Sequence, residues 1–124
     1  MKIQESAENY LETILVLGLN GDPVRSVDIA NELHFSKPSV SIAMKNLRMG
    51  GYVQFGPSMH VLLTPSGREI AERMYERHVF LTDWLTSIGV DEAVAARDAC
   101  KMEHVVSVES FDAIKSFAKK HPSH

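Results

Sequence analysis

The 124-residue sequence contains one cysteine, and aromatic residues make up only 7% of it. A single cysteine forms no internal disulfide, which favours a protein of the reducing cytoplasm. The longest apolar run near the start, ILVLGL, is too short to span a bilayer, and no signal peptide is recognisable. These observations lead us to expect a cytoplasmic protein with no membrane partner. The HExxH, GxSxG and P-loop patterns are also missing, so we expect that the protein is not an enzyme.

The net charge of −3 is unevenly distributed along the chain. Residues 24–68 carry five Lys or Arg against two Asp or Glu, a net charge of +3. Residues 1–23 carry one basic against four acidic side chains, and residues 69–124 carry seven against ten, so each of these segments has a net charge of −3. A basic middle between acidic ends fits a segment that contacts a polyanion. A chance fluctuation among so few charges would give the same pattern.

The first half of the chain has the pattern of a helix followed by a helix-turn-helix. Apolar residues recur at three- and four-residue steps over residues 4–18, which predicts a helix. A short helix with Ser26 as its cap follows, then a break at His34, then a second helix capped by Ser36 that stops at Gly50. Two short helices with a tight turn indicate a helix-turn-helix. A generic helical hairpin is the alternative.

A hairpin and three further helices are predicted next. Residues 52–55 and 60–64 alternate in polarity around GPSM, which predicts two strands. Thr64 and Pro65 have the residue types of a helix start, and this long helix is expected to reach about Ile88. Two more helices are expected, one capped by Asp91 and a last one that buries three apolar residues, Phe111, Ile114 and Phe117. We therefore predict a mainly α protein with an N-terminal winged helix-turn-helix and two-stranded wing, residues 1–64, and an all-helical domain, residues 65–124.

Side chains that bind metals recur in both predicted domains. The candidates are Asn9, Glu12, His78, Cys100, Glu103 and His104. The last three share one face of a predicted helix because positions i, i+3 and i+4 lie together, and His78 interrupts an apolar stripe. Thiolate, imidazole, carboxylate and amide oxygen are ligands of divalent transition metals. Each residue alone has an ordinary structural explanation, so the metal hypothesis depends on their conjunction.

Four segments resemble the diphtheria-toxin-repressor/manganese-transport-regulator family. They are ENYLETI, KPSVSIAMKNLRMGGYV, LTPSGREIAERMYERH and DACKMEHVVS, in the family's order, and the resemblance covers roughly residues 4–118. Members of this family are cytoplasmic, homodimeric, metal-activated transcriptional repressors, with a winged-helix domain followed by a helical domain that dimerises. The resemblance therefore implies a homodimer that binds a palindromic operator on double-stranded DNA and controls metal-homeostasis genes.

The resemblance also implies a set of metal ligands. His78, Glu103 and His104 fall on ligand positions that both branches of the family have, and Glu12 falls on one that the manganese branch uses. By this resemblance, a metal ion held by the first helix and the helical domain together would fix the angle between the two DNA-binding domains of a dimer. Metal binding would then raise DNA affinity through a population shift.

Four positions depart from one branch of the family or from both. Cys100 stands where the iron branch has Cys and the manganese branch has Glu, and Asn9 matches neither branch. Thr82 and Ala96 stand where the iron branch has ligands for an ancillary ion. Because a thiolate favours Fe(II) over Mn(II), we expect one Fe(II)-type site, with Mn(II) as the alternative.

Residues of the second helix of the helix-turn-helix and of the wing are the candidates for DNA contact. They are Ser36, Lys37, Pro38, Ser39, Ser41, Lys45, Arg48, Ser58 and His60, where Pro38 is included because the family uses this position against thymine methyl groups. A solvated helix face is the other explanation of Lys45 and Arg48. A winged-helix regulator that responds to a small molecule or to oxidation of Cys100, without metal, stays open as an alternative function.

Overall fold

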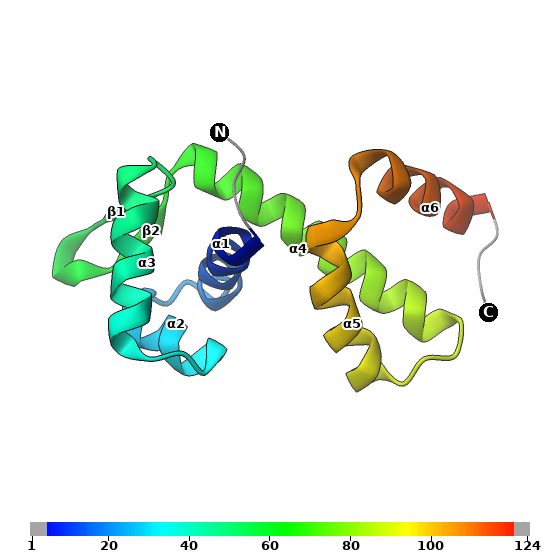
Figure 1. The fold of residues 1–124 in the computed structure, drawn as a ribbon, viewed down its shortest axis with the longest axis horizontal. Coiled ribbons are helices and arrows are strands. Elements are labelled where there is room, and N and C mark those ends of the chain that lie inside the picture. Colours follow the sequence, from blue (N-terminus) through cyan, green and yellow to red (C-terminus); the bar gives the residue numbers. More distant parts are fainter. Residues whose placement is uncertain (1–4, 121–124) are drawn as a thin grey trace. The chain divides into compact units, whose positions relative to one another are not determined.

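The computed structural model describes residues 5–120 of the chain. Figure 1 shows its helices and strands in sequence colours. In order they are α1 (Glu5–Leu17), α2 (Ser26–Leu33), α3 (Lys37–Met49), β1 (Val53–Phe55), the 3-10 turn η1 (Pro57–Met59), β2 (Val61–Leu63), α4 (Pro65–Ser87), α5 (Glu92–Val105) and α6 (Val108–Lys120). The prediction of a mainly α protein with a winged helix-turn-helix and a helical C-terminal part is confirmed.

The chain forms two compact units, which are described separately. The first unit ends at Arg73 and the second begins at Met74, so the division falls within α4. The first unit contains α1 to β2 and the first turns of α4, and the second contains the rest of α4 with α5 and α6. A functional boundary between residues 64 and 65 stays a prediction.

The helix-turn-helix is formed by α2 and α3. Ser36 is the N-cap of α3, and its hydroxyl oxygen accepts a hydrogen bond from the Ser39 backbone N–H at 3.3 Å. His34 ends α2 in the left-handed conformation, with a φ of 58°. The prediction that Ser26 caps α2 is wrong. Arg25 occupies the cap position, and its backbone N–H donates to the Asp28 carboxylate at 2.9 Å, so Asp28 takes over the capping role from the third helical position.

The core of the first unit is aliphatic. Its most deeply buried side chains come from all three helices and the hairpin: Leu11, Ile14, Ile29, Val40, Met44, Val53 and Val61. α2 packs against α1 and α3, β1 packs against α3, and β2 packs against α1. This packing turns the opposite face of α3 toward solvent.

The wing is a two-stranded antiparallel hairpin that leads into α4. Val53 pairs with Leu63 and Phe55 with Val61, so each strand is shorter than the sequence pattern predicted. Thr64 joins the hairpin to α4, because its hydroxyl donates to the Gly51 carbonyl at 2.7 Å and accepts from the Gly67 N–H at 3.1 Å. The wing and the start of α4 are therefore tied to the end of α3.

The second unit has a small core made by all of its helices. Leu81, Ala99 and Phe111 are buried in it, and partly buried apolar side chains pack around them: Phe80, Trp84, Met102 and Val106. The prediction that Phe117 is buried is wrong, since 61% of its surface is exposed. It lies at the rim of a pocket of about 400 Å³, also lined by Phe80 and Trp84, which the described residues leave open. Among the helices of residues 5–120, none combines the length and the hydropathy that a membrane crossing requires.

Candidate metal centre and nucleic-acid interface

A histidine–carboxylate pair joins α4 to α5 in the second unit. His78 Nδ1 lies 3.0 Å from Glu103 Oε1, within hydrogen-bonding distance. Glu103 is fully buried, and within residues 5–120 its other oxygen, Oε2, has no hydrogen-bond partner. A buried carboxylate with one unsatisfied oxygen is costly unless a cation or a donor compensates its charge. Glu103 therefore has the environment of a metal ligand.

The electrostatics of the pair follow from this contact. The hydrogen bond to the Glu103 carboxylate, together with its negative charge, raises the pKa of His78 above the ordinary value. Partial burial of the ring opposes this increase, because burial disfavours the charged imidazolium. A divalent cation bound here would compete with the proton on His78.

Cys100 and His104 lie on α5 with Glu103. Both are half-buried, and the spacing of three and four residues from Cys100 puts these side chains on one side of the helix. The unit thus offers one thiol, two imidazoles and one buried carboxylate, the donor types that bind Fe(II), Mn(II) and neighbouring divalent metals. The residues present fit such an ion.

Arg77 supports this arrangement and was missed in the sequence. Its guanidinium is buried, and Nη1 donates to the backbone carbonyls of Glu103 at 2.9 Å and of Val106 at 2.8 Å. Its Cζ also lies 5.2 Å from the centre of the Phe111 ring. A cation at the C-terminal end of α5 satisfies carbonyls that have no partner within the helix. A basic residue next to the apolar stripe of the long helix was the only sequence signal.

Glu12 and Asn9, the remaining predicted ligands, belong to the first unit. Glu12 is buried on α1 with 7% of its surface exposed, which is unusual for a carboxylate. Asn9 is half-buried, and its backbone carbonyl accepts a hydrogen bond from the Thr13 hydroxyl at 2.8 Å. Their participation in the metal site stays a prediction.

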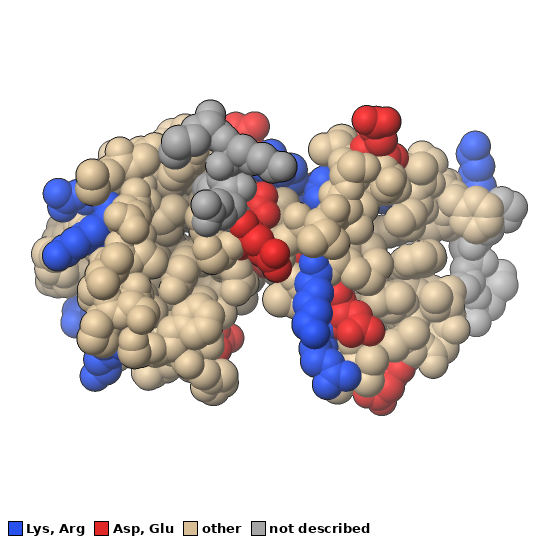
Figure 2. All heavy atoms as spheres, viewed as in Figure 1, with Lys and Arg blue, Asp and Glu red and all other residues tan. Residues whose placement is uncertain are grey.

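The DNA candidates of the helix-turn-helix lie on the solvent face of α3. Every one of them is exposed: Ser36, Lys37, Pro38, Ser39, Ser41, Lys45 and Arg48. Figure 2 shows several Lys and Arg side chains along the margin of this unit that carries α3 and the wing. The Arg48 guanidinium carbon lies 5.6 Å from the centre of the Phe55 ring, so this side chain also contacts the wing.

Ile42 occupies the same exposed face and was not among the candidates. It has 62% of its surface exposed in the second turn of α3. Its sequence signal is an aliphatic residue in phase with Ser39 and Lys45 and out of phase with the buried residues of the helix.

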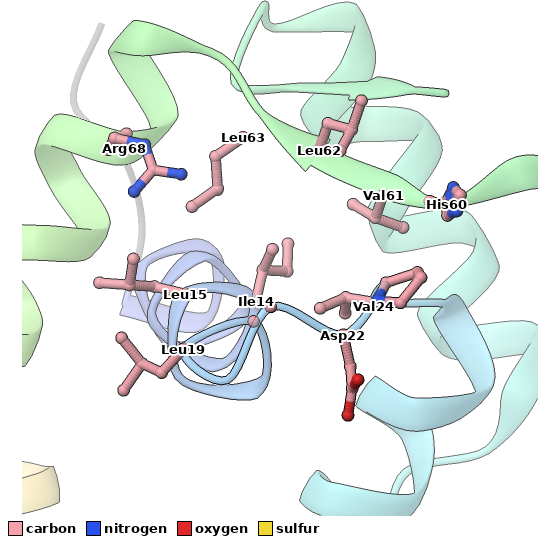
Figure 3. Close-up of a pocket in the computed structure, with 13 residues that line it drawn as sticks. Ile14, Leu15, Leu19, Asp22, Val24, His60, Val61, Leu62, Leu63 and Arg68 are labelled. Carbon is pink, nitrogen blue, oxygen red and sulfur yellow. The ribbon is translucent and has the colours of Figure 1, made fainter. Parts of the chain in front are cut away.

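The two wing candidates differ in environment. Ser58 is exposed in η1 with a positive φ of 58°, whereas His60 is half-buried. His60 lines a pocket of about 450 Å³ in the first unit, between α1, the segment that follows it and β2 (Figure 3). The walls are mainly aliphatic, from residues such as Ile14 and Leu63, with Asp22 and Arg68 as the charged members. One carboxylate and one imidazole make a poor metal site, so this pocket does not compete with the pair in the second unit.

Together the two units define a protein with a winged-helix unit and a helical unit, and the helical unit has a buried carboxylate next to donor groups that suit a divalent cation. Models of one protein family match both parts of the chain. The iron-dependent repressor N-terminal DNA-binding domain matches residues 2–61, and the iron-dependent repressor metal-binding and dimerisation domain matches residues 64–124. The chain belongs to this family of metal-dependent repressors, the family of the diphtheria toxin repressor and the manganese regulator MntR.

Curated relatives match over nearly the whole chain. The transcriptional regulator MntR of Salmonella typhimurium is 37% identical over 118 residues, which are 95% of this chain and 75% of that protein. An uncharacterised helix-turn-helix regulator of Methanocaldococcus jannaschii is 33% identical over 123 residues, which are 95% of this chain and 96% of that protein.

Solved structures show the same architecture. A manganese-dependent transcriptional repressor in complex with manganese has a TM-score of 0.79 and 28% identity, and covers 92% of this chain and 51% of its own. The manganese regulator SloR has a TM-score of 0.81 at 24% identity, and the match covers 96% of this chain and 55% of the SloR chain. This similarity supports the fold alone.

Family membership confirms the expected class of activity. The protein is a metal-dependent transcriptional repressor that binds DNA and Fe(II) or Mn(II), forms a homodimer and is not an enzyme. This result decides against the alternative of a regulator that acts without metal.

Proposed function

We propose that His78, Cys100, Glu103 and His104, with Glu12 of α1, hold one divalent metal ion that controls operator binding. The observation that carries this proposal is the buried Glu103 carboxylate, with one oxygen paired to His78 and the other without a partner among residues 5–120. The ion supplies the positive charge that makes burial of this carboxylate favourable. Asn9, whose amide oxygen is a weaker ligand than a carboxylate, is a secondary member.

Fe(II) is the proposed cognate metal. Cys100 is the only thiol of the chain, and soft thiolate ligands favour Fe(II) over Mn(II), which prefers carboxylates and water. Mn(II) is supported by the similar solved structure, which is a manganese-dependent transcriptional repressor in complex with manganese. Zn(II) affinity in vitro does not identify the cognate metal, because the Irving–Williams order favours zinc at almost any such site.

We propose that the protein acts in the cytoplasm and that its DNA target is a palindromic operator. A homodimer presents two copies of α3, and a two-fold symmetric protein matches two half-sites separated by whole turns of DNA. The contacts come from the exposed face of α3 and from the wing, at Ser36, Lys37, Pro38, Ser39, Ser41, Lys45, Arg48, Ser58 and His60. Lys37, Lys45 and Arg48 are placed to contact phosphates, which fix the register of the helix in the groove.

An anaerobic metal titration of the purified dimer tests the metal site. For the wild type, we expect one Fe(II) per chain and tighter binding of Fe(II) than of Mn(II). In His104→Ala, we expect the binding of both metals to be lost. Cys100→Ser should reduce the difference in affinity between Fe(II) and Mn(II), because a hydroxyl is a harder and weaker ligand than a thiolate. His60→Ala, a histidine of the first unit, is the matched control and should leave metal binding unchanged.

The possible results separate the parts of the proposal. Two Mn(II) ions per chain with little Fe(II) preference would assign the protein to manganese sensing despite Cys100. Full binding in His104→Ala would contradict the ligand set. No saturable binding of either metal would overturn the site as a whole.

A further inference from the structure

The face of α3 that points to solvent contains one branched aliphatic side chain among polar ones. Ile42 is exposed over 62% of its surface, while Ser39 and Lys45, three residues before and after it, and Asn46, four residues after it, are exposed and polar. Residues at these spacings lie next to one another on a helix. Ile42 is therefore the apolar centre of a polar helix face.

Ile42 does not belong to the buried core that the described residues form. The buried face of α3 is formed by Val40, Met44 and Leu47, which are 0%, 0% and 6% exposed. Ile42 is two residues from both Val40 and Met44, so it points away from that core. A β-branched residue on the exposed surface of a helix also has a lower helix propensity than alanine. Its use at this position is thus not explained by the stability of α3.

The major groove of DNA offers one apolar group on the base edges. This group is the C5 methyl of thymine, whereas the other groups there are hydrogen-bond donors and acceptors. An isoleucine side chain neither donates nor accepts a hydrogen bond. Placed against guanine, adenine or cytosine it would remove water from polar groups without replacing their hydrogen bonds, and placed against a thymine methyl it buries apolar surface on both sides.

We propose that Ile42 contacts a thymine methyl in each operator half-site and so selects thymine at that position. The proposal rests on the function proposed above, with α3 in the major groove. Pro38 lies four residues before Ile42 on the same exposed face, so the two form a pair of apolar contacts one helical turn apart. Lys45 and Ser39 then position the helix on the phosphate backbone of the DNA, and Ile42 adds a preference for one base.

The test removes the methyl group from the DNA and the side chain from the protein, separately and together. The operator is first obtained by selection from a random DNA library with the metal-loaded wild-type dimer. Each thymine of a half-site is then replaced in turn by deoxyuridine, which lacks only the C5 methyl. Binding of every duplex is measured for the wild type, for Ile42→Ala, and for the control Leu19→Ala, which shortens an equally exposed aliphatic residue of the same unit (59% exposed).

For the wild type and for Leu19→Ala, we expect one deoxyuridine position per half-site to weaken binding about fourfold, the value of one buried methyl group. For Ile42→Ala, deoxyuridine at the same position should not change the affinity for DNA, although the variant still binds DNA. If no deoxyuridine position loses its effect in Ile42→Ala, or if the selected half-site contains no thymine, the assignment of Ile42 is overturned. A library that yields no enriched sequence would instead overturn the operator-binding function, and the Ile42 proposal with it.

Discussion

The DNA-contact candidates of the first unit and the buried carboxylate of the second unit lie in opposite environments. In the first unit, most of the side chains proposed to contact DNA lie on the solvent face of α3, and the opposite face of this helix forms part of the core. In the second unit, Glu103 is fully buried and its partner His78 is partly buried. On α3, DNA contact and folding are assigned to opposite faces of one helix, whereas in the second unit the proposed metal ligand Glu103 is itself part of the buried interior.

This difference predicts how each unit responds to substitution. Replacing an exposed residue of α3 should change DNA affinity with little effect on the free energy of unfolding. Replacing a buried polar residue at or near Glu103 should change metal affinity, or should change stability where buried partners are left unsatisfied. The following variants test this contrast, beginning with the largest expected effect.

Arg77→Met should lower the free energy of unfolding by about 3 kcal/mol or more, because two hydrogen bonds from a charged group to buried carbonyls are lost. Chemical denaturation of the metal-free protein measures this effect. Arg97→Met, which replaces an exposed arginine of α5, is the matched control and should have almost no effect. Equal stability of the two variants would contradict a stabilising role for Arg77.

Glu103→Gln should weaken metal binding by at least about 100-fold, since it removes the negative charge and one strong ligand oxygen. It should not lower the stability of the metal-free protein much, because a neutral amide is less costly to bury than an uncompensated carboxylate. Calorimetric titration and thermal unfolding provide the two measurements. Glu109→Gln, on an exposed position of α6, is the control. Metal affinity within about threefold of the wild type would remove Glu103 from the ligand set.

Lys45→Ala should weaken operator binding about 5- to 10-fold at moderate salt and reduce the dependence of binding on salt, because one phosphate contact disappears. Metal affinity should stay unchanged, in contrast to the Glu103 variant, and the stability of the protein should stay unchanged as well. Fluorescence anisotropy at several salt concentrations measures the slope. A slope that equals the wild-type value would identify Lys45 as a solvated residue of the helix face.

Ser36→Ala should lower the free energy of unfolding by about 1 kcal/mol, because it removes the N-cap of α3. Ser36→Asp restores an acceptor at the cap, so it should recover stability while its negative charge weakens DNA binding. The pair of variants separates capping from DNA contact. Equal stability of Ser36→Ala and the wild type would show that other groups satisfy the start of α3.

The order of the elements could be predicted from the sequence, because each element has a local signature. Ser36, Pro65 and Asp91 mark helix starts that the structure confirms, and alternating polarity marks the two strands. The cap of α2 could not be predicted from residue type alone, because the acceptor is Asp28, three residues after the true cap position. Phe117 was expected in the core, yet a helical unit of this size exposes it.

The sequence predicted candidate residues for the site but not the contacts between them. Spacing identified Cys100, Glu103 and His104 as neighbours on one helix, but the contact between His78 and Glu103 depends on how α4 packs against α5. Arg77 was missed because its partners are backbone carbonyls, which have no identity in a sequence. Ile42 was missed because the candidates for DNA contact were polar or charged residues, with Pro38 as the one apolar exception.

The most direct test of the account is the operator affinity of the wild type and of Glu103→Gln, each measured with saturating Fe(II) or Mn(II) and again with a chelator. We expect metal to raise wild-type affinity about 5- to 150-fold, the usual range of such couplings. The same metal concentration should have little effect on Glu103→Gln, whose affinity should match that of the chelated wild type. Equal operator affinity of the wild type with and without metal, or an undiminished metal response in Glu103→Gln, would contradict the claim that the buried carboxylate controls DNA binding.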